Sequence, residues 1–313
     1  MKQFIKSWAL PLAMLCGIIG YFLARAVIPT NIKPHVLALV SNVQPLLIGA
    51  MLFVSFCKIR FSSIRFCKWH LHAVIFQMVA TCLLTLIALV VDIDTNTRLL
   101  LESAIVCFLY PTATAAIVVV SKLGERTESL VTYVIFIHLA TAIFAPIIAS
   151  LLHNEGITCT SEALSFIAIK TLPLILIPLF AAAAFRKISP KVIDKLNKQK
   201  NLAFYLWAIA LTFAMSFSMR SIVQSNISIH LLIGLAVISG AACAIQFYFG
   251  RHISKHHHSS ISASQALGQK NTVFGIWMAY TFFTPITAVV GGFYSVWHNM
   301  YNSWQLYQKC RKG

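Results

Sequence analysis

Long apolar stretches separated by short polar segments are the dominant pattern along the chain. A membrane-spanning helix needs about 20 mostly apolar residues to cross the hydrocarbon core of a bilayer. Ten stretches meet this need: 8–28, 35–57, 69–91, 98–121, 129–152, 162–185, 200–222, 227–250, 259–283 and 285–308. The polar segments between them leave no room for a soluble domain. The pattern therefore predicts an all-α membrane protein with a single polytopic domain over residues 1–313.

Composition and charge support a bilayer as the surroundings. The chain is 58% hydrophobic and 11% charged, whereas soluble domains are about 25% charged. Its net charge of +17 would favour a nucleic-acid partner in a soluble protein. Here, 19 of the 25 basic residues fall in alternate polar segments on one side, and four (Arg25, Lys33, Arg98 and Arg220) fall on the other. Basic residues favour the cytoplasmic side, so we expect a plasma (inner) membrane protein with both termini cytoplasmic and no nucleic-acid partner.

The apolar stretches repeat in two halves, about 8–152 and about 162–308. The stretches that begin at 69 and 227, for example, start 158 residues apart. Because each half has an odd number of helices, the second would enter the membrane in the opposite orientation. Inverted repeats of this kind are typical of secondary transporters, whose solutes bind near the midplane at interrupted helices.

Matching interruptions occur in the fourth and ninth stretches. The fourth contains "CFLYPTATAAIVVVSKLG", with Pro111 in mid-span followed by Thr112 and Thr114, and the ninth contains Gly268-Gln269-Lys270-Asn271. Pro111 and Lys270 are 159 residues apart, close to the repeat offset. Proline breaks or kinks a helix, and backbone groups freed in a bilayer need a cavity, solute or ion. We therefore predict that both helices break and cross, and that Pro111, Thr112, Thr114, Lys270 and Asn271 bind a substrate; a purely structural proline kink is the alternative.

At these residues the chain resembles the bile acid:sodium symporter family. The segments that carry the resemblance are "NVQPLLIGAMLFVSFCKIRFSSIRF", "YPTATAAIVVVSKLGE", "QALGQKNTVFG" and "GGFYSVWHNMYNSW". The resemblance implies ten helices in two inverted five-helix repeats, with the fourth and ninth helices broken and crossing. It also implies panel helices 1, 2, 6 and 7, core helices 3–5 and 8–10, and uptake of organic anions with sodium.

The sodium ligands that the resemblance implies are only partly present. Gln77, Ser129, Gln265 and Gln269 match positions that hold sodium in the family. Ala116 and Ile117, which have no side-chain oxygen, stand where the family has Ser and Asn, and Gln265 stands in place of its acidic ligand. Amide oxygens can still hold a hard cation, but without a neutralising carboxylate. Sodium is therefore only a candidate coupling ion.

Lys270 stands where the family motif has Asn. A lysine at mid-bilayer costs about 2.5–3.5 kcal/mol on insertion scales, so such residues usually have a function. One hypothesis is that its ammonium replaces the charge of sodium and pairs with an anionic solute. A second is that it takes up and releases a proton and couples transport to protons. A third is that it only pairs with helix carbonyls or reaches toward the cytoplasmic surface.

The function that these features favour is secondary transport of a small organic anion by alternating access. The alternative is a non-transporting membrane sensor or scaffold with the same fold. We expect no enzyme activity and no catalytic residues, because most of the eight acidic residues lie in loops and no H-E-x-x-H or G-x-S-x-G motif occurs. No metal site or cofactor is expected beyond possible sodium, since the cysteines form no C-x-x-C pair. The solute, the coupling ion, the direction of transport and the oligomeric state stay open.

Overall fold

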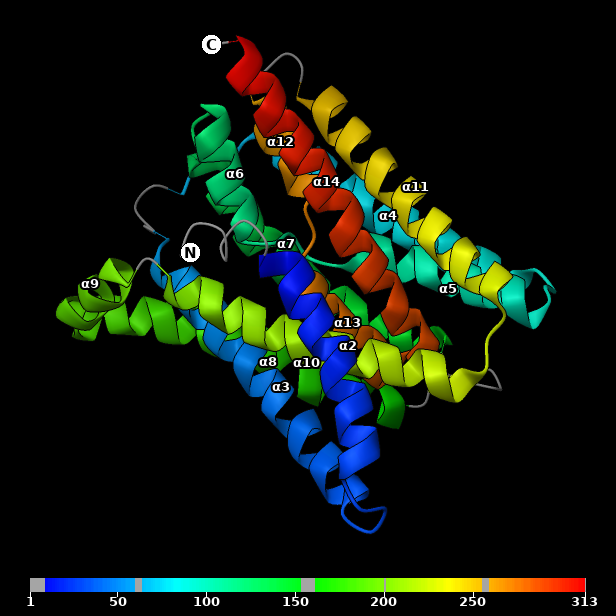
Figure 1. Cartoon of the computed structure of the whole chain (residues 1–313). Coiled ribbons are helices and arrows are strands. Elements are labelled where there is room, and N and C mark those ends of the chain that lie inside the picture. Colours follow the sequence, from blue (N-terminus) through cyan, green and yellow to red (C-terminus); the bar gives the residue numbers. More distant parts are fainter. Residues whose placement is uncertain (1–8, 60–63, 153–160, 200, 255–258, 313) are drawn as a thin grey trace. The chain divides into compact units, whose positions relative to one another are not determined.

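The computed structural model describes residues 9–59, 64–152, 161–199, 201–254 and 259–312 (Figure 1). The described residues are helical apart from short connections, which confirms the all-α prediction. The helices are α2 (Ala9–Val27), α3 (Lys33–Cys57), α4 (Lys68–Val90), α5 (Thr95–Leu109), α6 (Ala115–Leu123), α7 (Glu128–Leu152), α8 (Ser161–Ile188), α9 (Pro190–Lys198), α10 (Leu202–Ser225), α11 (Ile229–Ile253), α12 (Ser260–Gly268), α13 (Thr272–Phe282), the 3-10 turn η3 (Pro285–Thr287) and α14 (Ala288–Lys312).

Within the described residues, seven helices are long and apolar enough to cross a membrane, which agrees with an integral membrane protein. They are α2, α3, α4, α7, α8, α10 and α11. The other three predicted stretches differ for physical reasons. Two are each divided into a pair of short helices, α5 with α6 and α12 with α13. The third, α14, ends in a polar segment with Lys309, Arg311 and Lys312.

The chain divides into two compact units. The first comprises residues 1–59 and 173–226 and contains α2, α3, α9, α10 and the second part of α8. Within it, α10 packs against α2 and α3 (Figure 1). Gly17 lets α2 approach α10 closely, because a side chain there would collide with the Thr212 carbonyl and with Met215. The Ser216 hydroxyl donates to the Gly17 carbonyl at 2.8 Å. Small residues and hydroxyls of this kind join helices in membranes.

The second unit comprises residues 60–172 and 227–313 and holds α4 to α7 and α11 to α14. Here α11 packs against α5, α12 and α14, and α4 packs against α5 and α7 (Figure 1). The half-helices α12 and α13 are buried over nearly their whole length. A helix buried on all sides lies inside a bundle and does not face lipid. The second interrupted stretch, α12 with α13, therefore lies in the interior of this unit.

The short helix α9 was not expected from the sequence. It follows α8 after Ser189, and its exposed lysines Lys191, Lys195 and Lys198 surround one buried apolar residue, Ile193. Its nine residues are too few to give a spanning signal, and its lysines place it in a polar segment of the sequence. Amphipathic helices with basic polar faces lie along membrane surfaces.

Candidate functional site

The first break separates α5 from α6 at the predicted proline. Helix α5 ends at Leu109, and Tyr110 takes φ −55° and ψ 134°. A residue before proline is pushed out of the helical region by the proline ring, and Pro111 has no N–H to continue the helix. Helix α6 then starts at Ala115, with Thr114 at its N-cap position. The sequence Tyr-Pro-Thr therefore causes this break directly.

The second break separates α12 from α13 without a proline. Helix α12 ends at Gly268, and Gln269 has the extended angles φ −92° and ψ 94°. The Asn271 side chain then accepts a hydrogen bond from the Phe274 N–H at 3.3 Å and caps the start of α13. Asparagine is among the best N-cap residues because its side chain satisfies an otherwise unpaired helix N–H. The polar cluster thus ends one half-helix and starts the next.

The two breaks are joined by backbone hydrogen bonds. Thr112 and Lys270 form an isolated antiparallel bridge. The Ala113 N–H donates to the Gln269 carbonyl, and the Asn271 N–H donates to the Pro111 carbonyl, each at 2.8 Å. Each break therefore supplies partners for groups that the other leaves unpaired, as a lipid environment requires.

Polar side chains satisfy the carbonyls at the end of α5. The last carbonyls of any helix lack partners within that helix. Here Cys107 accepts from Gln246 at 3.3 Å, Phe108 from the Lys270 ammonium at 3.5 Å, Leu109 from Thr141 at 3.3 Å and Tyr110 from Gln77 at 3.0 Å. These donors come from α11, the second break, α7 and α4. The end of α5 is therefore held by four separate segments.

Lys270 is the only charged member of this set. Its side chain is 1% exposed, and its single described acceptor, the Phe108 carbonyl, lies at 3.5 Å. That distance is beyond the usual 2.7–3.2 Å of an N–H···O bond, and an ammonium has three donors to satisfy. The titratable groups that act on it are the thiols of Cys107 and Cys243. Within the described residues, the ammonium is thus only weakly satisfied and has no carboxylate partner.

Four half-helix ends meet around the breaks. Helices α5 and α12 end there, and α6 and α13 begin there. Helix C-termini carry partial negative charge and favour cations, whereas N-termini carry partial positive charge and favour anions. The crossing therefore has a place suited to a cation, where the Lys270 ammonium lies against the end of α5. It also has two helix starts suited to an anion.

The residues predicted to bind substrate are brought together at these ends. Pro111, Thr112, Lys270 and Asn271 take part in the bridge and its flanking hydrogen bonds. The Thr112 hydroxyl also donates to the Ala266 carbonyl. Thr114 lies two residues beyond the bridge and is half-buried at the start of α6.

The four predicted sodium ligands are not equally placed. Both polar atoms of the Gln77 side chain already have partners at the crossing. Its amide nitrogen donates to the Tyr110 carbonyl, and its oxygen accepts from the Tyr133 hydroxyl at 3.4 Å. Gln265 and Gln269 are buried, and the side-chain oxygen of each lacks a hydrogen-bond partner among the described residues. Ser129 lies in the first turn of α7 and is half-buried. Gln265 and Gln269 thus each keep a buried side-chain oxygen without a described donor.

Several residues that build the site were not expected from the sequence. Tyr294 on α14 donates to the Gly268 carbonyl at 2.9 Å and accepts from Gln246 at 3.1 Å. Asn302 and Gln305, also on α14, accept from the Gln265 amide at 2.7 Å each. Asn302 and Gln305 are three residues apart and so share one helix face, a signal that could have been used. Tyr294 lies in the segment "GGFYSVWHNMYNSW", but its role depends on carbonyl and amide groups from distant segments, which the sequence does not reveal.

Two glycines make room for the buried ring of Tyr110. A side chain at Gly275 of α13 would overlap this ring, and one at Gly291 of α14 would approach its hydroxyl to 3.1 Å. The residue at the first break therefore packs into the second half-helix and into α14. This packing fixes how closely the broken helices approach.

A carboxylate caps the start of α12. Glu125, just after α6, accepts hydrogen bonds from the Ile261 N–H at 3.0 Å and from the Ser262 N–H and hydroxyl at 2.7 Å each. Helix N-termini favour negative charge. Glu125 thereby ties α6 to α12 at the ends away from the breaks.

No family model matches the chain, and a search of curated protein sequences gives no match either. The geometry of the crossing is therefore the basis for the functional proposal.

Proposed function

We propose that the chain is a secondary transporter that moves a small organic anion across the membrane by alternating access. The observation that carries this proposal is the Lys270 ammonium, which is buried where two interrupted helices meet and has no carboxylate partner in the described part of the chain. Burying an ammonium without a carboxylate partner is expensive, and residues that bear this cost inside a membrane usually have a function. A bound anion would supply the missing partner.

The ammonium takes the part that a sodium ion has in many transporters. In such proteins, unwound carbonyls and half-helix C-terminal ends coordinate the coupling cation. Lys270 directs its nitrogen to the Phe108 carbonyl at the C-terminal end of α5. A tethered cation at this place makes a free sodium ion unnecessary. We therefore propose transport that does not depend on sodium.

The anion would bind on the other side of the same charge. The starts of α6 and α13 favour negative groups, and Thr114 and Asn271 lie at these starts. A carboxylate, sulfate or phosphate group could then accept from the ammonium donors that lack close partners. This arrangement accounts for an anion as the solute class and leaves the rest of the solute undefined.

The wider architecture belongs to the same proposal. We propose ten transmembrane helices in two inverted five-helix repeats, with α5/α6 and α12/α13 as the interrupted members and both termini cytoplasmic. The resemblance to bile acid:sodium symporters supports this arrangement, as does the separation of α2, α3, α9 and α10 from α4–α7 and α11–α14. In this proposal the site at the crossing opens to each side of the membrane in turn.

The first experiment is a thermal-shift screen of organic anions on the purified protein in detergent, with sodium and with choline in its place. A ligand at one hundred times its Kd stabilises a protein by about 2.7 kcal/mol, which is readily measured. We expect at least one class of carboxylate, sulfate or phosphate compound to raise the Tm equally in both buffers. Stabilisation only by neutral compounds or cations would overturn the proposal.

A second experiment separates a transporter from a sensor with the same fold. The anion found in the screen is supplied to liposomes that contain the protein, and its accumulation is followed. Saturable entry above that of protein-free liposomes supports transport. Stabilisation by the anion without entry would assign the protein to sensing.

A further inference from the structure

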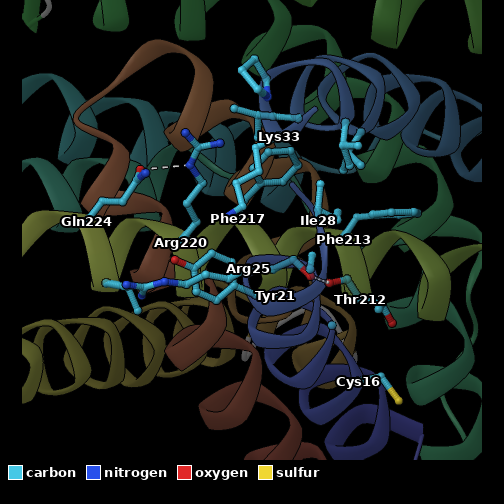
Figure 2. A pocket seen from close by; sticks show the side chains of 18 residues that line it. Cys16, Tyr21, Arg25, Ile28, Lys33, Thr212, Phe213, Phe217, Arg220 and Gln224 are labelled. Carbon is cyan, nitrogen blue, oxygen red and sulfur yellow. Dashed lines mark hydrogen bonds between the residues drawn. The ribbon is translucent and has the colours of Figure 1, made fainter. Parts of the chain in front are cut away.

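A second site lies in the first unit, at one end of α2, α3 and α10. A cavity of about 720 Å³ is lined by the end of α2, the start of α3 and the second half of α10 (Figure 2). Ligand pockets in proteins typically have volumes of about 300–1,000 Å³. The cavity therefore has the size of a binding site, and its lining residues all lie within this one unit.

Three basic side chains line this cavity. Arg25 lies in the last turn of α2, Lys33 begins α3 and Arg220 lies on α10. Arg220 is oriented by a hydrogen bond from its Nε to the Gln224 side chain at 3.0 Å (Figure 2). This bond leaves the two terminal nitrogens of the guanidinium for a ligand. A guanidinium with two such nitrogens binds phosphate in a bidentate way.

The described lining of the cavity carries no acidic side chain to offset these three charges. None of the lining residues is an Asp or Glu, and Asp194 on α9 is the only acidic residue in the sequence of this unit. The three basic residues at the cavity also share one expected side of the membrane. The charge pattern assigns only four basic residues to the outer segments, and three of them line this cavity.

The remaining lining is mostly apolar. It includes Val36, Leu37 and Val40 of α3 and Phe213 and Phe217 of α10. The adjoining surface of α2 exposes Leu12, Leu15, Ile19, Phe22 and Leu23. Such a surface suits contact with lipid chains. The cavity thus combines a cationic group of residues with an apolar wall next to a lipid-facing helix.

We propose that this cavity binds one anionic phospholipid from the adjacent leaflet. Its phosphate would contact Arg25, Lys33 and Arg220, and part of an acyl chain would lie along the apolar wall. Basic pockets between transmembrane helices bind anionic lipid headgroups in this way. The site is separate from the crossing and does not depend on the transport proposal.

Native mass spectrometry of the purified protein tests this proposal. The probe is phosphatidylglycerol added to the detergent, with phosphatidylcholine of the same acyl chains as the zwitterionic comparison. We expect one tightly held phosphatidylglycerol and weaker binding of phosphatidylcholine. The single variants Arg25→Gln, Lys33→Gln and Arg220→Gln should each weaken binding roughly fivefold. Equal binding of both lipids by the unchanged protein would overturn the proposal.

The matched control removes the same number of charges from the same unit. The variant with Lys191→Gln, Lys195→Gln and Lys198→Gln changes exposed lysines of α9 and should keep the tightly held lipid. A loss as large as in the variant that combines Arg25→Gln, Lys33→Gln and Arg220→Gln would mean general attraction to a basic protein and would contradict the site. The Tm without added lipid shows that each variant is folded, and Arg25→Lys should retain most of the binding. Glycerol phosphate, which lacks acyl chains, should not compete; equal affinity for it would exclude a lipid as the occupant.

Discussion

Replacement of Lys270 by methionine distinguishes a functional ammonium from a structural cap by the sign of the stability change. Methionine has a similar length and no charge. Burying the ammonium at mid-bilayer costs about 2.5–3.5 kcal/mol, while a cation at a partly buried helix C-terminus returns at most about 2 kcal/mol. Because the contact to the Phe108 carbonyl is long, at 3.5 Å, the stabilisation by the helix C-terminus is smaller than the free-energy cost of burying the ammonium. The variant should therefore be more stable than the unchanged protein by about 1 kcal/mol.

The assay is thermal unfolding in detergent, with and without the anion from the screen. For a unit of this size, about 1 kcal/mol corresponds to a rise in Tm of about 2–4 °C. The anion should then no longer stabilise the variant. Lys170→Met is the control, since this exposed lysine lies over the Phe166 ring at 4.1 Å and should change neither result. A fall of several degrees in the Lys270→Met variant, with stabilisation by the anion retained, would show that the lysine only caps α5.

Three further predictions concern the crossing and two helix starts. Cysteines replacing Thr112 and Lys270 should form a disulfide identifiable by mass spectrometry, because Cα atoms at a non-hydrogen-bonded antiparallel pair lie about 4.5 Å apart. The control pair, Thr112→Cys with Thr281→Cys, should form no disulfide. A disulfide in the control pair and none between positions 112 and 270 would refute the bridge. Glu125→Ala removes the three hydrogen bonds at the start of α12 and should lower stability by about 1–2 kcal/mol, so an unchanged Tm would contradict this cap. At the start of α5, hydrogen bonds from the Thr97 side chain and from backbone N–H groups hold the pKa of Asp94 below its ordinary value. Its stabilising effect is thus complete above about pH 4 and lost as the pH falls further, so the Tm difference between the protein and Asp94→Ala should narrow in acid and should not widen.

The sequence predicts the positions of both breaks because their causes are local. Pro111 lacks an N–H and excludes its neighbour from the helical region, and the run from Gly268 to Asn271 is polar and short. The lengths of the apolar stretches also predict where the helices lie, because a bilayer requires a minimum apolar length. These properties can be read without knowing which segments meet.

The partners at the crossing cannot be read in this way. Gln246, Thr141 and Tyr294 are polar residues on three different helices, and each has a role only because a carbonyl from a distant segment lies opposite it. The basic cavity depends likewise on three segments meeting at one end of a unit. Long-range packing decides these contacts, and the pattern of apolar and polar residues along the chain does not show which segments pack together.

Uptake of the identified anion by liposomes in buffer without sodium tests the central claim most directly. Choline replaces sodium, and the pH is varied so that a proton-coupled mechanism appears as a dependence on the proton gradient. The account predicts saturable uptake that persists without sodium in the unchanged protein and in Lys170→Met, and is lost in Lys270→Met. Uptake that requires sodium, ignores pH and survives the loss of Lys270 would contradict it.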